Sequence, residues 1–591
     1  MKRSTRIAYK LIRFTHKLPS RQLMIAISIV VGFIVGIIAV VIKNLVHFIQ
    51  SLLTGGFSID YSNYLYVLYP AIGVLVTILF VKYLLRKPVR DGVPNVLHAI
   101  SRDYGLIKPH NMYSSIVSSA LTVGFGGSVG LEGPTVVTGA AWGSNIGRLL
   151  GLNYKQEVAL LGMASAAAMS AIFKAPIAAI VFALEVILFD LTMTAMVPLL
   201  VASIVAALTS YFFIGMDVLY PFEVIDKFRL RETPFYLGLG LFTSLLSYYF
   251  IRLYVITGKI FDKIRGWFWR FLTGASLLGL IIFLMPSLYG EGYEAINEAM
   301  HSDFSFIFDN SIFYDLSDNL PVTLLLMLGI VLFKALATSL TFRAGGIGGI
   351  FAPTLFMGTM AGLFFVSLLN YFGDFGLPAS SFVLVGMAGM LAGVVHAPLT
   401  AIFLIAEITG GYQLFFPIMI VATTSYSMAR LFSPRSIYTI QLANRGDMLT
   451  HHKDKTMLSM MNLKDEIETD FSTVDVNANL GDLVKVVANS TRNIFPVVDK
   501  EENLYGLIFL DHIRHTMFKP ELYEETTVRS LMFKPSKVVS INDDMETVAQ
   551  KFQHSGKYNL VVVDGDKYLG FVSRANVYSH YRDILRDFSE D

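Results

Sequence analysis

Apolar runs as long as a bilayer is thick recur along the first 440 residues of the chain. The run from Leu23 to Ile42 contains no charged residue and is long enough to cross the hydrocarbon core as a helix. Of all residues, 54% are hydrophobic and 16% are charged, whereas a soluble protein carries about a quarter charged residues. The chain has no cysteine, which excludes disulfides and thiolate metal sites. The sequence therefore predicts a helical membrane protein with several crossings.

The residues before the first apolar run are strongly basic. Residues 1–21 contain Lys and Arg but no Asp or Glu. This excess predicts a cytoplasmic N-terminus. A nucleic-acid-binding arm is the other interpretation, but orientation beside a membrane span explains the charges better. The apolar run is too long for a cleaved signal peptide, and no cleavage site of small residues follows it.

The membrane part contains an internal repeat. The segment from Ala175 to Glu185 matches the segment from Ala397 to Glu407, and a Gly-rich turn ending in Pro precedes each copy by about forty residues. Two halves with Gly/Pro-interrupted apolar segments at corresponding places are typical of a transporter, with the binding site near the midplane. We expect an all-α polytopic membrane domain built from two inverted repeats with broken helices.

Glu132 is the most informative residue. It lies in Gly130-Leu131-Glu132-Gly133-Pro134 and is the only Asp, Glu, Lys or Arg between Lys108 and Arg148. An ionisable group in an apolar segment is a functional candidate. Pro134 places it in the first turn of a helix, where N–H groups and partial positive charge attract anions. Glu132 is predicted to block the site when ionised and to leave it when protonated.

Two further Gly-Pro turns predict helix starts of the same kind. These are Asp91-Gly92-Val93-Pro94 and Gly348-Gly349-Ile350-Phe351-Ala352-Pro353. Glycine allows close approach of the backbone and positive φ. Three helix N-termini aimed at one point would bind an anion without a cationic side chain.

These motifs resemble those of the CLC chloride channel and transporter family, and they occur in the family's order over about residues 20–445. The resemblance implies a homodimer in which each subunit has its own pathway and Glu132 is the gating carboxylate. It also implies that Ile350 and Phe351 donate backbone amides to the anion and that Tyr438 donates a hydroxyl. The predicted anion-binding residues are Asp91, Gly92, Gly130, Gly133, Gly349, Ile350, Phe351 and Tyr438.

Two positions depart from the family pattern. Asp91 stands where the family often has Ser, so the identity of the anion is open. Val186 stands where proton-coupled members often have a second glutamate. We expect transport of a small monovalent anion, chloride above others, with a passive channel favoured and chloride/proton exchange as the alternative. Glu185 and Glu407 are expected to be structural.

Two other classes of protein fit the sequence less well. A divalent-cation transporter would need several membrane carboxylates, but the stretches 344–373 and 408–429 contain no Asp, Glu, Lys or Arg. A sensor with a plain membrane anchor would gain nothing from broken helices. The sequence implies no enzyme activity, cofactor, metal or nucleic-acid partner.

The C-terminal region has strand and helix patterns that occur twice. It resembles the paired cystathionine-β-synthase-type (CBS) domains that follow many CLC proteins. The resemblance implies a pair of α/β domains on the cytoplasmic side of a bacterial inner or plasma membrane. The predicted domains are a basic segment at 1–21, a transport domain at 22–445, a linker at 446–456 and CBS domains at 457–520 and 521–591. The positions expected to bind a nucleotide's ribose and phosphates hold Phe509 and His512 in the first repeat, and Ser573 and Asn576 in the second. Binding of an adenine nucleotide is therefore expected to be weak or absent.

Overall fold

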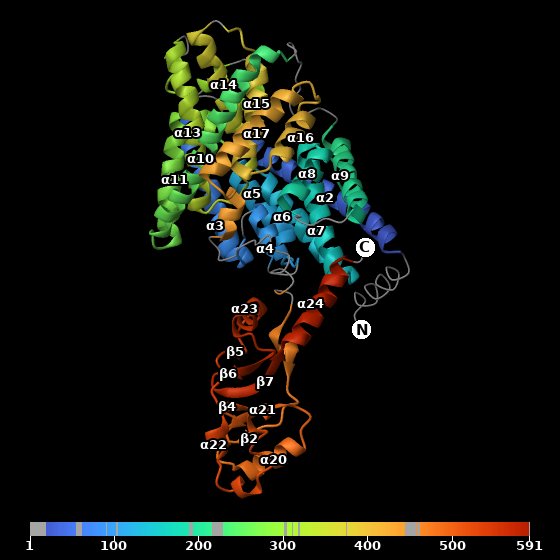
Figure 1. Cartoon of the computed structure of the whole chain (residues 1–591). Helices are drawn as coiled ribbons and strands as arrows, with labels where there is room; N and C mark the ends of the chain where they lie inside the picture. Colours follow the sequence, from blue (N-terminus) through green and yellow to red (C-terminus); the bar gives the residue numbers. More distant parts are fainter. Residues whose placement is uncertain are drawn as a thin grey trace. The chain divides into compact units, whose positions relative to one another are not determined.

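The computed structural model describes residues 19–54, 62–89, 92–101, 105–187, 193–215, 228–300, 304–309, 311–316, 319–373, 375–443, 458 and 461–589. The chain divides into two compact units, Met1–Leu449 and Thr450–Asp591. Helices build the first unit, and strands with helices build the second (Figure 1).

The first unit consists of helices that confirm the predicted polytopic membrane fold. Among the residues just given, nine helices are long and apolar enough to span a bilayer. Two π-helical turns, η1 (Phe80–Leu85) and η2 (Ala183–Ile187), continue α3 and α8. The α-helices are α2 (Ser20–Thr54), α3 (Ser62–Leu79), α4 (Gly92–Ser101), α5 (Asn111–Gly124), α6 (Glu132–Leu150), α7 (Tyr154–Phe173), α8 (Pro176–Phe182), α9 (Met193–Ile214), α10 (Thr233–Asp262), α11 (Trp267–Leu284), α12 (Tyr293–Met300), α13 (Leu320–Ala344), α14 (Phe351–Phe372), α15 (Ala379–Val395), α16 (Pro398–Ile408), α17 (Phe415–Phe432) and α18 (Ile437–Ala443).

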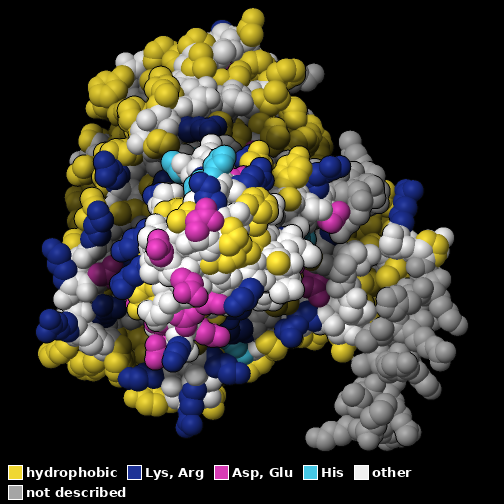
Figure 2. Space-filling model, turned by 60° about the horizontal axis from the view of Figure 1, so that its bottom comes forward, with side chains coloured by type: hydrophobic (Ala, Val, Ile, Leu, Met, Phe, Trp, Pro, Cys, Tyr) yellow, Lys and Arg dark blue, Asp and Glu magenta, His cyan; other side chains and the backbone are white. Residues whose placement is uncertain are grey.

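Large apolar side chains cover the outside of this unit. Phe212 is 82% exposed, Leu84 76% and Leu431 73%. Figure 2 shows hydrophobic side chains over broad areas of one face of the molecule. Extended apolar surface is rare on soluble monomers, and here lipid covers it. The chain is a multi-pass integral membrane protein.

Inside the unit, glycines let helices approach closely. Gly358 and Gly362 of α14 lie against α15, where a Cβ on Gly362 would overlap the carbonyl of Phe382. A Cβ on Gly386 of α15 would in turn overlap the carbonyl of Gly358. In a membrane, where lipid is as apolar as leucine, such close packing of small residues drives helix association.

The two repeats match in backbone conformation as well as in sequence. Helix α7 ends at Lys174 and helix α15 ends at His396, and both residues are left-handed, with φ of 56° and 62°. Each is followed by an alanine with nearly the same dihedral angles, φ −125° and ψ 81° at Ala175 and φ −129° and ψ 73° at Ala397. The turn that starts each Ala-Pro helix is thus the same structure in both halves.

The repeats also exchange helix caps. Glu185 of the first repeat accepts hydrogen bonds from the N–H groups of Leu399 and Thr400, at 3.2 and 2.8 Å, at the start of α16. Glu407 of the second repeat accepts them from Ile177 and Ala178, at 3.0 and 2.7 Å, at the start of α8. A carboxylate is favourable at a helix N-terminus. This confirms the expectation that both glutamates are structural.

The second unit contains two sheets with helices packed on them, as expected for a CBS pair. The strand order is β2-β3-β4 in one sheet and β1-β7-β6-β5 in the other. The strands are β1 (Ile467–Glu468), β2 (Val474–Asp475), β3 (Ile494–Val498), β4 (Leu504–Phe509), β5 (Val538–Ser540), β6 (Asn559–Asp564) and β7 (Lys567–Ser573). The helices are α20 (Leu480–Ala488), α21 (Leu510–Ile513), α22 (Val528–Leu531), α23 (Met545–Ser555) and α24 (Arg574–Ser589).

Each half of this unit lends a segment to the other half. Strand β1 precedes the first half but pairs antiparallel with β7 of the second, with Ile467 opposite Val572. Phe533 precedes β5, the first strand in chain order of the second half, but forms a bridge with Leu507 of β4 in the first half. The two halves are therefore interlocked. A single boundary in the chain, such as the one predicted at 520/521, does not describe this exchange of segments.

Candidate functional site

The two Gly-rich turns meet and bond to each other. The N–H of Gly130 donates to the carbonyl of Gly349 at 2.8 Å, and the N–H of Gly349 donates to the carbonyl of Gly130 at 2.6 Å. On either side, threonines from the opposite repeat bond the turns. Thr122 accepts from the N–H of Ile347 at 3.1 Å, and Thr341 accepts from the N–H of Ser128 at 3.3 Å. The pairing does not use the N–H groups in the first turns of α6 and α14, the helices that follow the two Gly-rich turns.

Three helix starts converge beside this bridge. Gly133 in the first turn of α6 lies against the backbone of Gly349 just before α14 and against Gly92, the first residue of α4. A Cβ on Gly133 would stand 3.1 Å from the Cα of Gly349 and 3.5 Å from the Cα of Gly92. In neither α6 nor α14 does the side chain of the N-cap residue bond an amide of the first turn. The N–H groups in the first turn of a helix have no partner within the helix, and this convergence directs them toward a common point.

Glu132 occupies that point. Its side chain is 1% exposed and folds back over Gly130 toward Ala352 in the first turn of α14. Oε1 accepts a hydrogen bond from the hydroxyl of Tyr293. Oε2 is buried and has no hydrogen-bond partner among the described residues, although the N–H of Ala352 lies close to the carboxylate. The carboxylate thus lies where two helix N-termini attract negative charge.

The remaining predicted residues surround this position. Ile350 is the N-cap residue of α14, and Phe351 follows as its first residue. The ring of Phe351 packs on Phe173 at 6.2 Å and on Phe182 at 5.6 Å, centroid to centroid. Tyr438 of α18 is 4% exposed and lies near Glu132. Asp91 lies outside the described residues.

This arrangement can hold a small anion by backbone amides and exclude it by a tethered carboxylate. The described contacts of Glu132 include a phenol and backbone groups but no cationic side chain within ion-pair distance. An anion and the Glu132 carboxylate would compete for the same amides. Removing the carboxylate's charge would remove the competitor, which is the behaviour of a gate.

Four residues around the gate were not singled out by sequence reasoning: Lys43, Glu291, Tyr293 and Lys334. Lys334 is the only charged residue of α13 before Arg343, and Lys43 lies deep in α2. Charges within apolar spans are functional candidates, so both lysines carried a signal. Glu291 and Tyr293 lie in a segment between spans, where acidic and aromatic residues are common and carry no signal.

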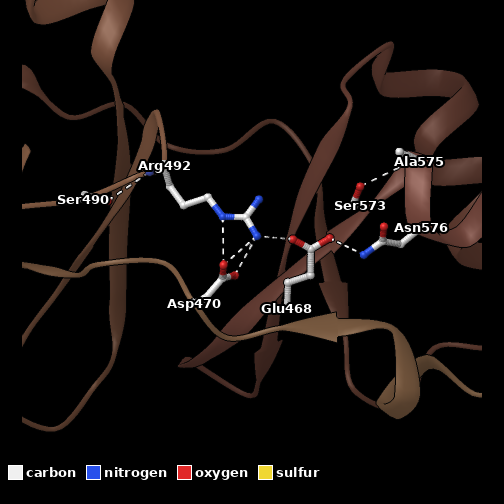
Figure 3. Close-up of polar contacts among 7 residues, drawn as sticks. All are labelled: Glu468, Asp470, Ser490, Arg492, Ser573, Ala575 and Asn576. Carbon is white, nitrogen blue, oxygen red and sulfur yellow. Dashed lines mark hydrogen bonds and ion pairs between the residues drawn. The ribbon is translucent and has the colours of Figure 1, made fainter.

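The second unit brings the two weak nucleotide positions beside an ionic cluster (Figure 3). Arg492 bonds Asp470 at 2.7 Å and Glu468 at 2.9 Å. Hydrogen bonding to Asp470 raises the pKa of Arg492 above its ordinary value, so this guanidinium is fully charged. The amide of Asn576 donates to Glu468 at 2.7 Å, and Ser573 accepts from the N–H of Ala575 at 3.2 Å. Two carboxylates face one cation here, which is unfavourable for phosphate.

Comparison with known proteins gives two family matches. The sequence model described as "Voltage gated chloride channel" matches residues 72–430, and the one described as "CBS domain" matches residues 528–583. A protein from Ralstonia nicotianae described as "Putative chloride channel protein ClcB-like" is 29% identical over 397 residues, which are 65% of this chain and 87% of the relative. The H(+)/Cl(-) exchange transporter ClcA of Salmonella paratyphi B is 26% identical over 477 residues, 74% of this chain and 94% of the relative.

Solved structures show the same fold. A slow cyanobacterial Cl-/H+ antiporter superposes with a TM-score of 0.61 at 21% identity, covering 72% of this chain and 98% of that chain. A eukaryotic CLC transporter superposes with a TM-score of 0.57 at 16% identity and covers 94% of this chain and 97% of that chain.

The hydrogen bond from Tyr293 should hold Glu132 in the site. We expect Tyr293→Phe to increase anion flux at neutral pH by on the order of tenfold, because a hydrogen bond to a charged group contributes about 1.5–3 kcal/mol. Flux from reconstituted vesicles measures this. Tyr314→Phe, a change at a 63% exposed tyrosine, is the matched control. Wild-type flux in Tyr293→Phe would contradict a role for this bond.

The ionic cluster in the second unit should disfavour ATP. We expect calorimetry with the full-length protein to detect no ATP binding at micromolar concentrations. The double variant Glu468→Gln, Asp470→Asn should bind ATP more tightly than wild type, because it removes two like charges and frees Arg492 for phosphate. Micromolar affinity in the wild type would show that the cluster opens for the nucleotide.

Proposed function

We propose that this chain, which belongs to the voltage-gated chloride channel (CLC) family, carries chloride through its membrane unit under the control of Glu132. Anion transport follows from the family. The finer proposal names Glu132 as the gate and the amides of Gly133, Ile350 and Phe351, with the hydroxyl of Tyr438, as the groups that receive the anion. The amides of Gly130 and Gly349, which the sequence also predicted to bind the anion, donate to each other's carbonyl groups instead.

One observation supports the gate above others. A fully buried carboxylate lies at the point where α4, α6 and α14 begin, with one oxygen bonded to a phenol and the other without a partner among the described residues. A buried carboxylate with incomplete hydrogen bonding is costly. This cost is understandable if the ionised carboxylate blocks the anion site in a closed state and the protonated carboxyl leaves the site in an open state.

Proton coupling is the open half of the proposal. Val186, 7% exposed, stands where a second pathway acid would be expected, and its neighbour Glu185 is committed to capping α16. These two residues favour conduction that is uncoupled or weakly coupled to protons. Exchange of chloride for protons is the second candidate. The Salmonella relative is named as an H(+)/Cl(-) exchange transporter, which supports this candidate.

The assembly and orientation complete the proposal. We place the N-terminal segment and the CBS unit in the cytoplasm, since residues 1–21 are basic and lack acids. We propose a homodimer with one pathway per subunit in a bacterial inner or plasma membrane. We assign the CBS unit a role in subunit packing or in sensing something other than ATP.

The first test neutralises the gate. Glu132→Gln should conduct anions at a rate nearly independent of pH, whereas wild-type flux should rise on acidification as Glu132 becomes protonated. The increase at neutral pH should be on the order of tenfold for every 1.4 kcal/mol of block that is lost. The measurement is chloride efflux from vesicles over a pH series, with Glu294→Gln, an exposed acid on α12, as the control.

The same vesicles decide between the two candidates. Proton uptake is followed against an imposed chloride gradient, with voltage clamped by a potassium ionophore. Uphill proton movement that disappears in Glu132→Gln would overturn the channel and leave the gate intact. Strong pH dependence remaining in Glu132→Gln would remove Glu132 from its assigned role.

The second test addresses anion choice at Asp91. If backbone dipoles form the site, Asp91→Ser should change which anion is preferred rather than whether any passes. Chloride preference should rise by roughly tenfold, because the change removes a like charge and adds a hydroxyl donor. Flux ratios among chloride, nitrate and fluoride are measured in wild type and variant. Identical ratios would show that Asp91 points away from the pathway.

A further inference from the structure

A second carboxylate shares the helix start that carries the gate. The N–H of Leu131, the N-cap residue of α6, donates to Oε1 of Glu291 at 3.1 Å. Glu132 is the next residue in the chain. Glu291 therefore accepts a hydrogen bond from an amide at the start of α6 that has no partner within the helix, while the Glu132 side chain turns toward α14.

The segment around Glu291 touches the gate directly. Tyr293, two residues after Glu291, donates its hydroxyl to Oε1 of Glu132, and Oε2 of Glu132 is buried without a partner among the described residues. Glu291 and Tyr293 are partly exposed, whereas Glu132 is 1% exposed. The segment thus lies between the buried gate and a more accessible part of the unit.

Two lysines balance the two carboxylates. Lys334 of α13 is fully buried, and its Nζ donates to the carbonyl of Gly290 at 2.9 Å and to that of Leu288 at 3.4 Å, beside Glu291. Lys43 of α2 donates from Nζ to the carbonyl of Ile172 at 2.6 Å and is close enough to interact with the charges of both carboxylates. Among the described contacts neither lysine bonds a carboxylate directly, so each acts on the carboxylates through its charge alone.

The charged and titratable groups that face Glu291 come from several elements. They are Glu132 of α6, Tyr293 of α12, Lys43 of α2 and Lys334 of α13, with Lys174 at the end of α7 facing Lys43. A like charge near Glu132 favours its protonated form, and an opposite charge favours its ionised form. Glu291 and Lys43 therefore act on the gate in opposite directions.

We propose that Glu291 is a positioning residue for the gate: it shares the start of α6 with Glu132, and its charge when it is ionised, set against Lys43 and Lys334, fixes the acidity at which Glu132 takes up a proton and leaves the anion site. The proposal rests on the proposed gating by Glu132. It adds a second residue, absent from the motifs of the sequence, that determines the pH range in which the protein conducts. Glu291 need not touch the anion, because its charge acts through Glu132.

The test measures the pH at which anion flux is half-activated. Glu291→Gln keeps an acceptor for the Leu131 amide but removes the charge, so activation should shift to lower pH by about one unit. Lys43→Met should shift activation to higher pH by a similar amount. The double variant should return close to wild type, because the two charges oppose each other. Glu294→Gln makes the same charge change at an exposed site and should shift nothing.

Two further measurements separate the possible failures. In the Glu132→Gln background, Glu291→Gln should have no effect on the pH profile, since no gate remains to titrate. Should Glu291→Gln fold poorly, Lys43→Met alone still tests the predicted sign. An unshifted midpoint in both single variants, with Glu132→Gln conducting freely, would overturn the role of Glu291 and leave the gate standing. Absence of anion flux in the wild type would instead overturn the proposed function.

Discussion

A broken helix inside a membrane leaves backbone groups without water, so the protein must satisfy them itself. The double hydrogen bond between Gly130 and Gly349 does this where the two repeats cross. Thr122 and Thr341 complete it by bonding the turn of the opposite repeat. A Cβ on Gly130 would overlap the Glu132 carboxylate, and a Cβ on Gly349 would stand 2.8 Å from the backbone nitrogen of Gly133. Close backbone contact at this one point allows α6 and α14 to begin in the middle of the unit.

The free amides that result explain the chemistry of the site. They attract negative charge without a lysine or arginine that would hold an anion tightly. The two lysines nearest the carboxylates of this site, Lys43 and Lys334, bond carbonyl groups. Under the proposed function, this positive charge would raise the local attraction for anions without providing a direct ligand. A weakly held anion is consistent with a protein that must release what it binds.

The sequence predicted the features that depend on backbone geometry. Gly130, Gly349 and Glu132 could be identified because glycines before Pro mark helix starts and a lone charge in an apolar stretch is conspicuous. Glu291 could not, because an acid between two spans is ordinary and its partner Leu131 lies 160 residues away. The caps by Glu185 and Glu407 were expected to be structural, but their exchange between repeats requires the fold. The pairing of β1 with β7 also escaped prediction, since a two-residue strand has no periodicity.

The exchanged caps make the membrane unit a single folding unit rather than two modules joined end to end. The amides that start α8 are bonded by Glu407, which follows Ala178 by 229 residues. During synthesis these amides have no carboxylate until most of the second repeat has been made. The first half can insert into the bilayer but cannot complete its own hydrogen bonding. Each copy of the repeat thus depends on the other for the carboxylate that bonds the start of its Ala-Pro helix.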